Sequence, residues 1–340
     1  MRISDIDYDL PPGLIAQTPL EPRDSAKLLI DRGSEPPLHR QVRDIAQFFE
    51  HGDVLVVNNT RVLPARLRLR RNSGGAVEVL LLEAKNGEHS LWEALLRPGG
   101  KLRPGEQLLG RDDDGIERPL LEVGERTRAG DTFMVTMLGG NALSLLARIG
   151  EMPLPPYITE KLQDAERYQT VYSRSPGSAA APTAGLHFTV QLLESFASRG
   201  VDIANVELCV GLDTFAPVSV EDPRDHVIHT ESYTVPEATI ELCQQANRVI
   251  AVGTTATRAL ETAATTGHLI GRSDLFITPG YDFKLVDMMM TNFHMPKTTL
   301  LLMIEAFIGK RWRDLYLNAV SENYRFLSFG DAMLLDRSLR

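Results

Sequence analysis

The spacing of short apolar runs in the middle of the chain restricts the fold more than any other sequence feature. Between residues 67 and 150, runs rich in Val, Leu, Thr and Phe are separated by turns that contain Gly and Pro, such as Pro98-Gly99-Gly100. Runs at roughly ten-residue spacing are typical of the strands of a small all-β barrel or sandwich. The predicted strands are residues 76–82, 90–96, 107–109, 120–123 and 132–137.

The sequence on either side of this region has the pattern of an α/β protein. Residues 53–58 form a mostly apolar run that ends in the polar cluster 58–61, as expected for a buried strand whose carboxyl end faces a ligand. Further strands are expected at 5–10, 248–252 and 274–278, and helices at 42–49, 257–264 and from Pro296 through Phe307. We therefore predict a discontinuous α/β domain, residues 1–66 and 151–340, with a small barrel-like all-β domain inserted at 67–150.

Composition places the chain among globular proteins. Its 340 residues suffice for two domains, and 43% hydrophobic with 24% charged residues is an ordinary balance. No apolar run is long enough to cross a bilayer, and residues 1–7 lack the apolar core of a signal peptide, so a cytoplasmic location is expected. Cys209 and Cys243 are too few for a disulfide framework or a four-cysteine zinc site.

A segment of small residues, 174–189, leads into a predicted helix. Between Ser175 and Gly185 it contains no large or charged side chain, so it makes a poor strand and a poor helix. Its glycines permit close approach to the backbone, and Thr189 is a suitable N-cap for a helix that ends at Gly200. Two interpretations remain open: a loop whose backbone N–H groups face a ligand, or a mobile linker.

Two histidines and a carboxylate alternate at residues 226–231. His226, His229 and Glu231 have the composition of a two-histidine, one-carboxylate metal site. In an extended strand, however, His226 faces away from the other two. A general base or a ribose-binding carboxylate is therefore favoured over a metal site, and a plain surface strand is the remaining alternative.

Two other regions carry groups suited to a nucleotide. Residues 248–262 resemble a strand, a turn and a helix, but they contain neither a P-loop nor a Gly-x-Gly-x-x-Gly motif. They still offer Thr254, Thr255 and Arg258 to an anionic group, although helix capping also explains the threonines. The loops 281–284 and 291–297 combine aromatic, acidic, amide, imidazole and ammonium groups, a set that suits stacking on a base.

An arginine cluster interrupts an otherwise acidic chain of net charge −9. Within eleven residues that contain no acid, the chain carries Arg61, Arg66, Arg68, Arg70 and Arg71. Local basic patches of this kind bind nucleic acid even when the total charge is negative. Alternate arginines are equally typical of the solvated face of a strand.

Taken together, these segments resemble the S-adenosylmethionine:tRNA ribosyltransferase-isomerase family of queuosine biosynthesis. The matching blocks cover nearly the whole chain. They are residues 23–29, 58–67, 176–189, 246–261, 279–284, 291–300 and 324–335. The family's fold, an α/β domain with an inserted β-barrel domain, agrees with the fold predicted from the spacing of apolar runs.

The resemblance implies an unusual use of S-adenosylmethionine. The ribosyl group is transferred to the aminomethyl group of 7-aminomethyl-7-deazaguanine at the tRNA wobble position, which gives epoxyqueuosine, adenine and methionine. S-adenosylmethionine is then a consumed substrate, with no cofactor and no metal. The partner implied by the resemblance is tRNA, bound at the anticodon region. From the arginine cluster itself we predict that these five side chains bind the tRNA, and we expect a monomer with no membrane partner.

The same resemblance implies roles for individual residues. Proton transfer is assigned to His187, His229 and His294, with Glu231 and Asp282 as carboxylate candidates. Binding of the substrates is assigned to Thr60, Arg61, Thr183, Thr254, Thr255, Arg258, Tyr281, Asn292 and Lys297.

Three positions depart from the family pattern. Cys209, Asp213 and Ala216 stand where the family usually has His, Gly, and Arg or Gln. A paralogue that acts on another nucleoside is therefore an alternative. Three others are an S-adenosylmethionine-dependent tRNA methyltransferase, a metal-dependent hydrolase built on residues 226–231, and a non-catalytic tRNA-binding protein.

Overall fold

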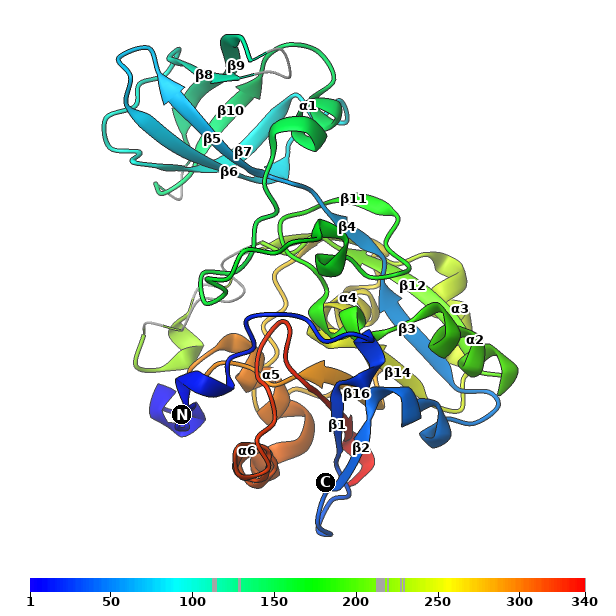
Figure 1. The fold of residues 1–340 in the computed structure, drawn as a ribbon. Coiled ribbons are helices and arrows are strands. Elements are labelled where there is room, and N and C mark those ends of the chain that lie inside the picture. Colours follow the sequence, from blue (N-terminus) through cyan, green and yellow to red (C-terminus); the bar gives the residue numbers. More distant parts are fainter. Residues whose placement is uncertain are drawn as a thin grey trace. The chain divides into compact units, whose positions relative to one another are not determined.

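The structure is a computed structural model, and it describes residues 1–111, 115–127, 130–211, 218, 220–226, 228 and 230–339. The chain divides into two compact units. Unit 1 consists of residues 1–60, 155–175 and 181–340, and unit 2 of residues 61–154 and 176–180 (Figure 1).

Unit 1 is built on a mixed sheet, in which nine strands are described. Their order is β15-β13-β12-β3-β14-β16-β17-β1-β2, and the four adjacent strands β12, β3, β14 and β16 run parallel. The strands are β1 (Lys27–Ile30), β2 (Leu38–Gln41), β3 (Val54–Asn58), β12 (Asp202–Leu208), β13 (Glu231–Thr234), β14 (Val249–Val252), β15 (Ile270–Ser273), β16 (Met288–Asn292) and β17 (Ala332–Asp336). The carboxyl ends of the parallel strands therefore meet at one edge of the sheet.

Both faces of the central strands are covered, which explains their continuous apolar sequences. On one face, Leu55, Val57, Ile250 and Val252 pack with side chains of α2 and the 3₁₀ helix η4. α4 packs against β3, β12, β14 and β16. The α-helices of unit 1 are α2 (Val190–Ser198), α3 (Glu237–Gln245), α4 (Gly253–Thr266), α5 (Thr299–Ile308) and α6 (Trp312–Ser321). Its 3₁₀ helices include η1 (Ile3–Ile6), η2 (Pro12–Leu14), η3 (Arg23–Ser25), η4 (Val42–Phe48), η5 (Ala165–Tyr168) and η6 (Thr183–His187).

Unit 2 is a closed antiparallel barrel with the strand order β10-β7-β6-β5-β8-β9. Its strands are β5 (Arg66–Arg71), β6 (Ala76–Ala84), β7 (Leu91–Arg97), β8 (Gln107–Arg111), β9 (Glu117–Arg126) and β10 (Phe133–Met137). Alternate residues such as Leu67, Leu69, Val77 and Val79 fill its interior. The helix α1 (Ala142–Ile149) follows β10, and Asn141 caps it through a bond from the Ser144 N–H. A separate two-stranded sheet pairs β4 (Thr60–Val62) with β11 (Ser175–Ser178).

The predicted fold class, an α/β domain with an inserted barrel-like domain, is confirmed, and each of the five predicted barrel strands is present. Three predictions of local structure are wrong. Residues 5–10 contain no strand, because the Asp5 carboxylate accepts the Arg2 N–H at 2.8 Å and closes the 3₁₀ turn η1. Residues 274–278 form no strand either, since β15 ends at Ser273. α5 begins at Thr299 rather than at Pro296, because Thr298 is its N-cap.

The small-residue segment is a packed part of unit 1 from Ala181 onward, so the mobile-linker interpretation is wrong there. Ala184, Gly185, Leu186, His187 and Phe188 are all buried. The close approach permitted by a glycine is made by this protein's own Tyr172, whose hydroxyl occupies the place of a Cβ at Gly185. The predicted helix follows as α2: Thr189 accepts the Leu192 N–H at 3.1 Å, and Gly200 adopts a φ of 74°.

This contact predicts a specific pattern of stability. Gly185→Ala should destabilise the protein by about 1–3 kcal/mol, because the new methyl group overlaps the Tyr172 hydroxyl. Adding Tyr172→Phe should recover part of the loss, since that hydroxyl has no hydrogen-bond partner among the described residues. Urea unfolding of both variants measures the effect. Gly13→Ala is the control, because a methyl group there meets no atom within 4 Å. Equal stabilities for the single and double variants would contradict the packing argument.

Candidate active site

A cavity of about 610 Å³ lies where β14 and β16 of unit 1 end. Small and hydroxyl-bearing residues form much of its wall. They are Ala181, Pro182, Thr183, Ala184, Gly253, Thr254, Thr255, Thr291, Thr298 and Ser328, alongside Asn292, His294, Tyr157 and several apolar side chains.

A second cavity, of about 570 Å³, adjoins the first. Thr254, Thr255 and Leu300 line both cavities. The second has a different chemical character, because its wall contains the buried Glu231–Arg258 pair together with His226 and Phe276. The two spaces, one lined by hydroxyl groups and the other by charged and aromatic side chains, thus meet at the start of α4.

The residues between the cavities belong to the first turn of α4. Gly253 begins this helix with a φ of +91°, a conformation that disfavours any residue with a side chain, and a Cβ there would contact Ala184. The N–H groups of a first turn have no partner within the helix, so they are available to an anionic or polar ligand. The Thr255 hydroxyl is buried and has no hydrogen-bond partner among the described residues. A buried hydroxyl without a partner in a cavity wall is available to hydrogen-bond to a ligand or to water.

His294 lies on the wall of the first cavity. Its Nε2 is 3.0 Å from the Thr291 hydroxyl, and its backbone N–H donates to the Tyr316 hydroxyl at 3.0 Å. Burial lowers the pKa of its imidazole to about 3, so the ring is neutral at physiological pH. A neutral imidazole carries one N–H donor and one lone-pair acceptor, and in His294 the Thr291 hydroxyl engages one of these two groups.

His187 is held behind this wall by Asn292. The Asn292 Nδ2 lies 3.2 Å from His187 Nε2, and the Thr183 hydroxyl donates to Asn292 Oδ1 at 2.9 Å. Burial, followed by the nearby Arg325 cation, lowers the pKa of His187 to about 4. Thr183 and Asn292 line the first cavity, whereas His187 lines a smaller cavity of about 280 Å³. The structure thus brings together Thr183, Thr254, Thr255, Asn292 and His294 on one wall and places His187 behind it.

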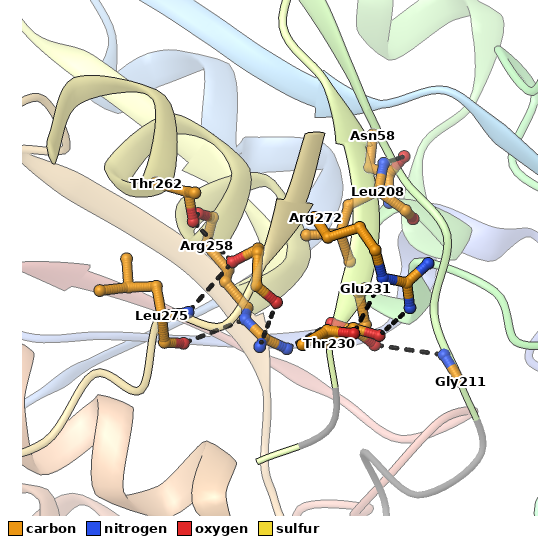
Figure 2. A network of polar contacts seen from close by, with 10 residues as sticks. Asn58, Leu208, Gly211, Thr230, Glu231, Arg258, Thr262, Arg272 and Leu275 are labelled. Atoms are coloured by element: carbon orange, nitrogen blue, oxygen red, sulfur yellow. Dashed lines mark hydrogen bonds and ion pairs between the residues drawn. The ribbon is translucent and has the colours of Figure 1, made fainter. Parts of the chain in front are cut away.

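Glu231 and Arg258 form a buried ion pair, shown in Figure 2, with 2.5 Å between Oε2 and Nη1. Arg258, on α4, also donates to the carbonyl groups of Leu275 and Ser273, each at 3.1 Å. Glu231, at the start of β13, accepts the Gly211 N–H through its other oxygen at 3.2 Å. Both charges are compensated and both side chains are held rigidly, so they present a fixed carboxylate and guanidinium to the second cavity.

Besides His187, four predicted site residues of unit 1 lie outside these two cavities. Asp282 is exposed, and the adjacent Lys284 ammonium lowers its pKa. Tyr281 donates to the fully buried Glu261 at 3.1 Å, and burial followed by that carboxylate raises its pKa to about 12. Lys297 pairs with Asp7 at 2.9 Å. Thr60 is buried, and its hydroxyl has no hydrogen-bond partner among the described residues.

The arginine cluster belongs to unit 2, where it is partly neutralised. Arg66, Arg68 and Arg70 alternate with buried leucines along β5, as predicted for the solvated face of a strand. Arg68 pairs with Glu151 at 2.9 Å, and Arg71 pairs with Glu106 at 2.5 Å. The acids come from elsewhere in the chain, so the local sequence did not reveal them. Arg61 is half-buried.

The proposed proton-transfer residue His229 lies outside the part of the chain that the structure describes. So do Asp213 and Ala216, two of the departures from the family pattern, whereas the third, Cys209, is described and half-buried.

Within the described ranges, no group of three or more His, Cys, Asp and Glu side chains could hold a metal ion. No helix in the described ranges combines the length and apolar character required to span a membrane.

The sequence did not single out three residues of the cavity walls. Tyr157 and Ser328 line the first cavity, and their hydroxyl groups are 2.7 Å apart. Phe276 lines the second cavity and stacks edge-on with His226 at 6.0 Å between ring centroids. Ser328 lies in one of the family-like blocks, but Tyr157 and Phe276 lie in none, so no motif marked them.

Comparison with known proteins gives a consistent result. A family model described as "Queuosine biosynthesis protein" matches residues 3–335. The S-adenosylmethionine:tRNA ribosyltransferase-isomerase of Symbiobacterium thermophilum is 48% identical, over 98% of this chain and 100% of that protein. The protein of the same name from Rubrobacter xylanophilus is 48% identical, over 100% of both chains.

A solved structure agrees with these relatives. The crystal structure of S-adenosylmethionine tRNA ribosyltransferase from Thermotoga maritima has a TM-score of 0.55 and 35% identity to this chain. The match covers 97% of this chain and 99% of the other. The family model matches residues 3–335 of this chain, and two full-length relatives are 48% identical to it. This chain therefore belongs to the queuosine biosynthesis protein family.

Proposed function

We propose that this protein is an S-adenosylmethionine:tRNA ribosyltransferase-isomerase. It transfers the ribosyl group of S-adenosylmethionine to 7-aminomethyl-7-deazaguanine in tRNA and releases adenine and methionine. S-adenosylmethionine is consumed as a substrate, and no further cofactor is required. The protein works as a monomer in the cytoplasm, where its tRNA substrate is found.

The observation that carries this proposal is the pair of adjoining cavities at the start of α4. A reaction that joins a sulfonium nucleoside to a base needs two neighbouring spaces whose contents meet. Thr254 and Thr255 line both cavities, so groups bound on either side come together at these hydroxyls. The cavity walls include residues from four of the family-like blocks, 176–189, 246–261, 291–300 and 324–335.

The chemistry assigns roles to the surrounding groups. The sulfonium makes the adjacent 5′ carbon acidic, so a base must accept its proton, and His294 is the neutral imidazole on the cavity wall. Departure of adenine requires hydrogen-bond donors, which the first turn of α4 supplies through its N–H groups and the Thr255 hydroxyl. Glu231 is the second candidate for the base, because its fixed carboxylate faces the adjoining cavity.

Isotopic labelling tests the reaction directly. S-adenosylmethionine is labelled separately in the methyl and ribose positions and incubated with the protein and tRNA that carries the deazaguanine precursor. We expect ribose label in tRNA together with free adenine and methionine. The variant His294→Gln tests the assignment of the base. Its rate should fall at least about a hundredfold, as expected when a general base is removed.

Other labelling results would overturn the proposal in distinct ways. Methyl label in tRNA would identify a methyltransferase. Absence of both labels would favour the paralogue acting on another nucleoside. Restoring the usual family residues with Cys209→His, Asp213→Gly and Ala216→Arg would then show whether these departures cause the loss.

The two buried imidazoles predict how stability depends on pH. The folded pKa values of His187 and His294, about 4 and about 3, lie below the ordinary value of 6.5. Below about pH 6.5 the unfolded chain therefore binds protons that the folded chain excludes, and stability falls by up to roughly 1.4 kcal/mol per pH unit for each histidine. Urea unfolding between about pH 7.5 and about pH 5 should show this loss.

A matched pair of variants isolates the cause of that loss. His187→Gln with His294→Gln should flatten the decline, whereas His268→Gln, at an exposed position, should leave it unchanged. A double variant with the wild-type decline would show that other groups dominate acid unfolding.

The arginine cluster of unit 2 is proposed to contact tRNA phosphates, with Arg70 as its best candidate because this side chain is exposed. Arg70→Ala should reduce the salt dependence of tRNA binding by about one in the slope of log K against log salt. Arg71→Ala is the comparison, since the Glu106 carboxylate already compensates that cation and the slope should change less. An unchanged slope for Arg70→Ala would remove this residue from the tRNA-binding surface.

A further inference from the structure

One backbone carbonyl determines the direction of the hydrogen bonds behind Thr183, that is, which atoms donate and which accept. The Asp331 carbonyl oxygen lies 3.4 Å from Asn292 Nδ2, and a carbonyl only accepts hydrogen bonds. Asn292 must therefore turn its NH₂ group toward Asp331, because the opposite orientation would place two acceptor oxygens against each other. Asn292 is only 2% exposed, so water does not relieve that repulsion.

This orientation determines the tautomer of His187. The same NH₂ group lies 3.2 Å from His187 Nε2, which must therefore accept. An Nε2 that accepts carries no proton, so the proton of the neutral ring is on Nδ1. Both Asn292 amide hydrogens and the His187 Nε2 are thereby engaged. His187 therefore acts on the first cavity through Asn292, as a positioning residue.

The other end of the amide determines the role of Thr183. Its Oδ1 is an acceptor, so the Thr183 hydroxyl must donate its only hydrogen to it, at 2.9 Å. The lone pairs of the hydroxyl oxygen remain, on a side chain that lines the first cavity. We propose that Thr183 binds a hydrogen-bond donor of the substrate, and that the chain Asp331–Asn292–His187 imposes this polarity. The identity of the donor rests on the proposed function: an N–H of the adenine or an O–H of the ribose of S-adenosylmethionine.

Substitution of Thr183 tests the ligand contact. Thr183→Val keeps the shape of the side chain and removes the acceptor, so the Kd for S-adenosylmethionine measured by calorimetry should rise about tenfold. Thr183→Ser keeps the hydroxyl and should bind within about twofold of the parent protein. Analogues that lack the exocyclic amine or one ribose hydroxyl locate the donor, because the valine penalty should vanish for one of them. Equal Kd values for the valine variant and the parent would overturn the contact.

Substitution of His187 tests the positioning chain. His187→Leu removes the acceptor for Asn292 and should weaken S-adenosylmethionine binding, although this histidine lies outside the first cavity. His187→Gln offers a side-chain oxygen in its place and should restore binding, which a merely space-filling role would not explain. Equal weakening of S-adenosylmethionine binding by both substitutions would contradict the proposed hydrogen-bond chain Asp331–Asn292–His187.

Nitrogen NMR of the protein with labelled histidine tests the polarity without any ligand or activity. The signal of His187, assigned by its loss in His187→Gln, should show a protonated Nδ1 and an unprotonated Nε2. A proton on Nε2 would reverse the direction of the hydrogen bonds between His187, Asn292 and Thr183, and it would overturn the inference. If S-adenosylmethionine fails to bind the parent protein, the proposed function is wrong. The tautomer of His187 still tests the direction of the hydrogen bonds, because that measurement needs no ligand.

Discussion

The burial of three adjacent parallel strands on both faces is the constraint on which the rest of unit 1 depends. β3, β14 and β16 are buried at every position and apolar throughout most of their length, because each face is covered. Polar groups are accommodated at the strand ends, and in parallel strands the carboxyl ends share one edge. Asn58 ends β3, Thr291 and Asn292 end β16, and α4 begins directly after β14. The position of the cavities is thus a consequence of how the core is filled.

Burial also decides which polar groups keep their charge. His187 and His294 lie in surroundings that compensate no positive charge, and both are neutral. Glu231 and Arg258, which are equally buried, compensate each other and are hydrogen-bonded to backbone groups. The walls of the two cavities therefore differ in electrostatic character although both belong to unit 1. Such a division suits a reaction that joins a cation to a neutral amine.

The sequence predicted the parts of the fold that depend on local periodicity. The barrel strands, β3, β14 and the Thr189 cap each follow from a few neighbouring residues. The errors arose where a distant or unexpected partner decides the structure. The Asp5 carboxylate closes a turn where a strand was expected, and Thr298 moves the start of α5 beyond Pro296.

The candidate site was predictable to a similar extent. Thr254, Thr255, Asn292 and His294 line the cavities as their family-like blocks implied. Tyr281 instead donates a hydrogen bond to the buried Glu261. His187 lies outside the first cavity and contacts Asn292, which is part of the cavity wall. Both differences depend on side-chain partners far away in the sequence, which no local motif reveals.

The strand order has a consequence for the synthesis of this protein. β17, residues 332–336, lies between β16 and β1, so the sheet remains in two pieces until this strand has left the ribosome. β1 meanwhile has an open edge, and exposed strand edges favour aggregation. Unit 2 needs only residues 61–154 and 176–180, so its barrel can close much earlier. During synthesis there is therefore an interval in which the barrel is complete and the sheet is not.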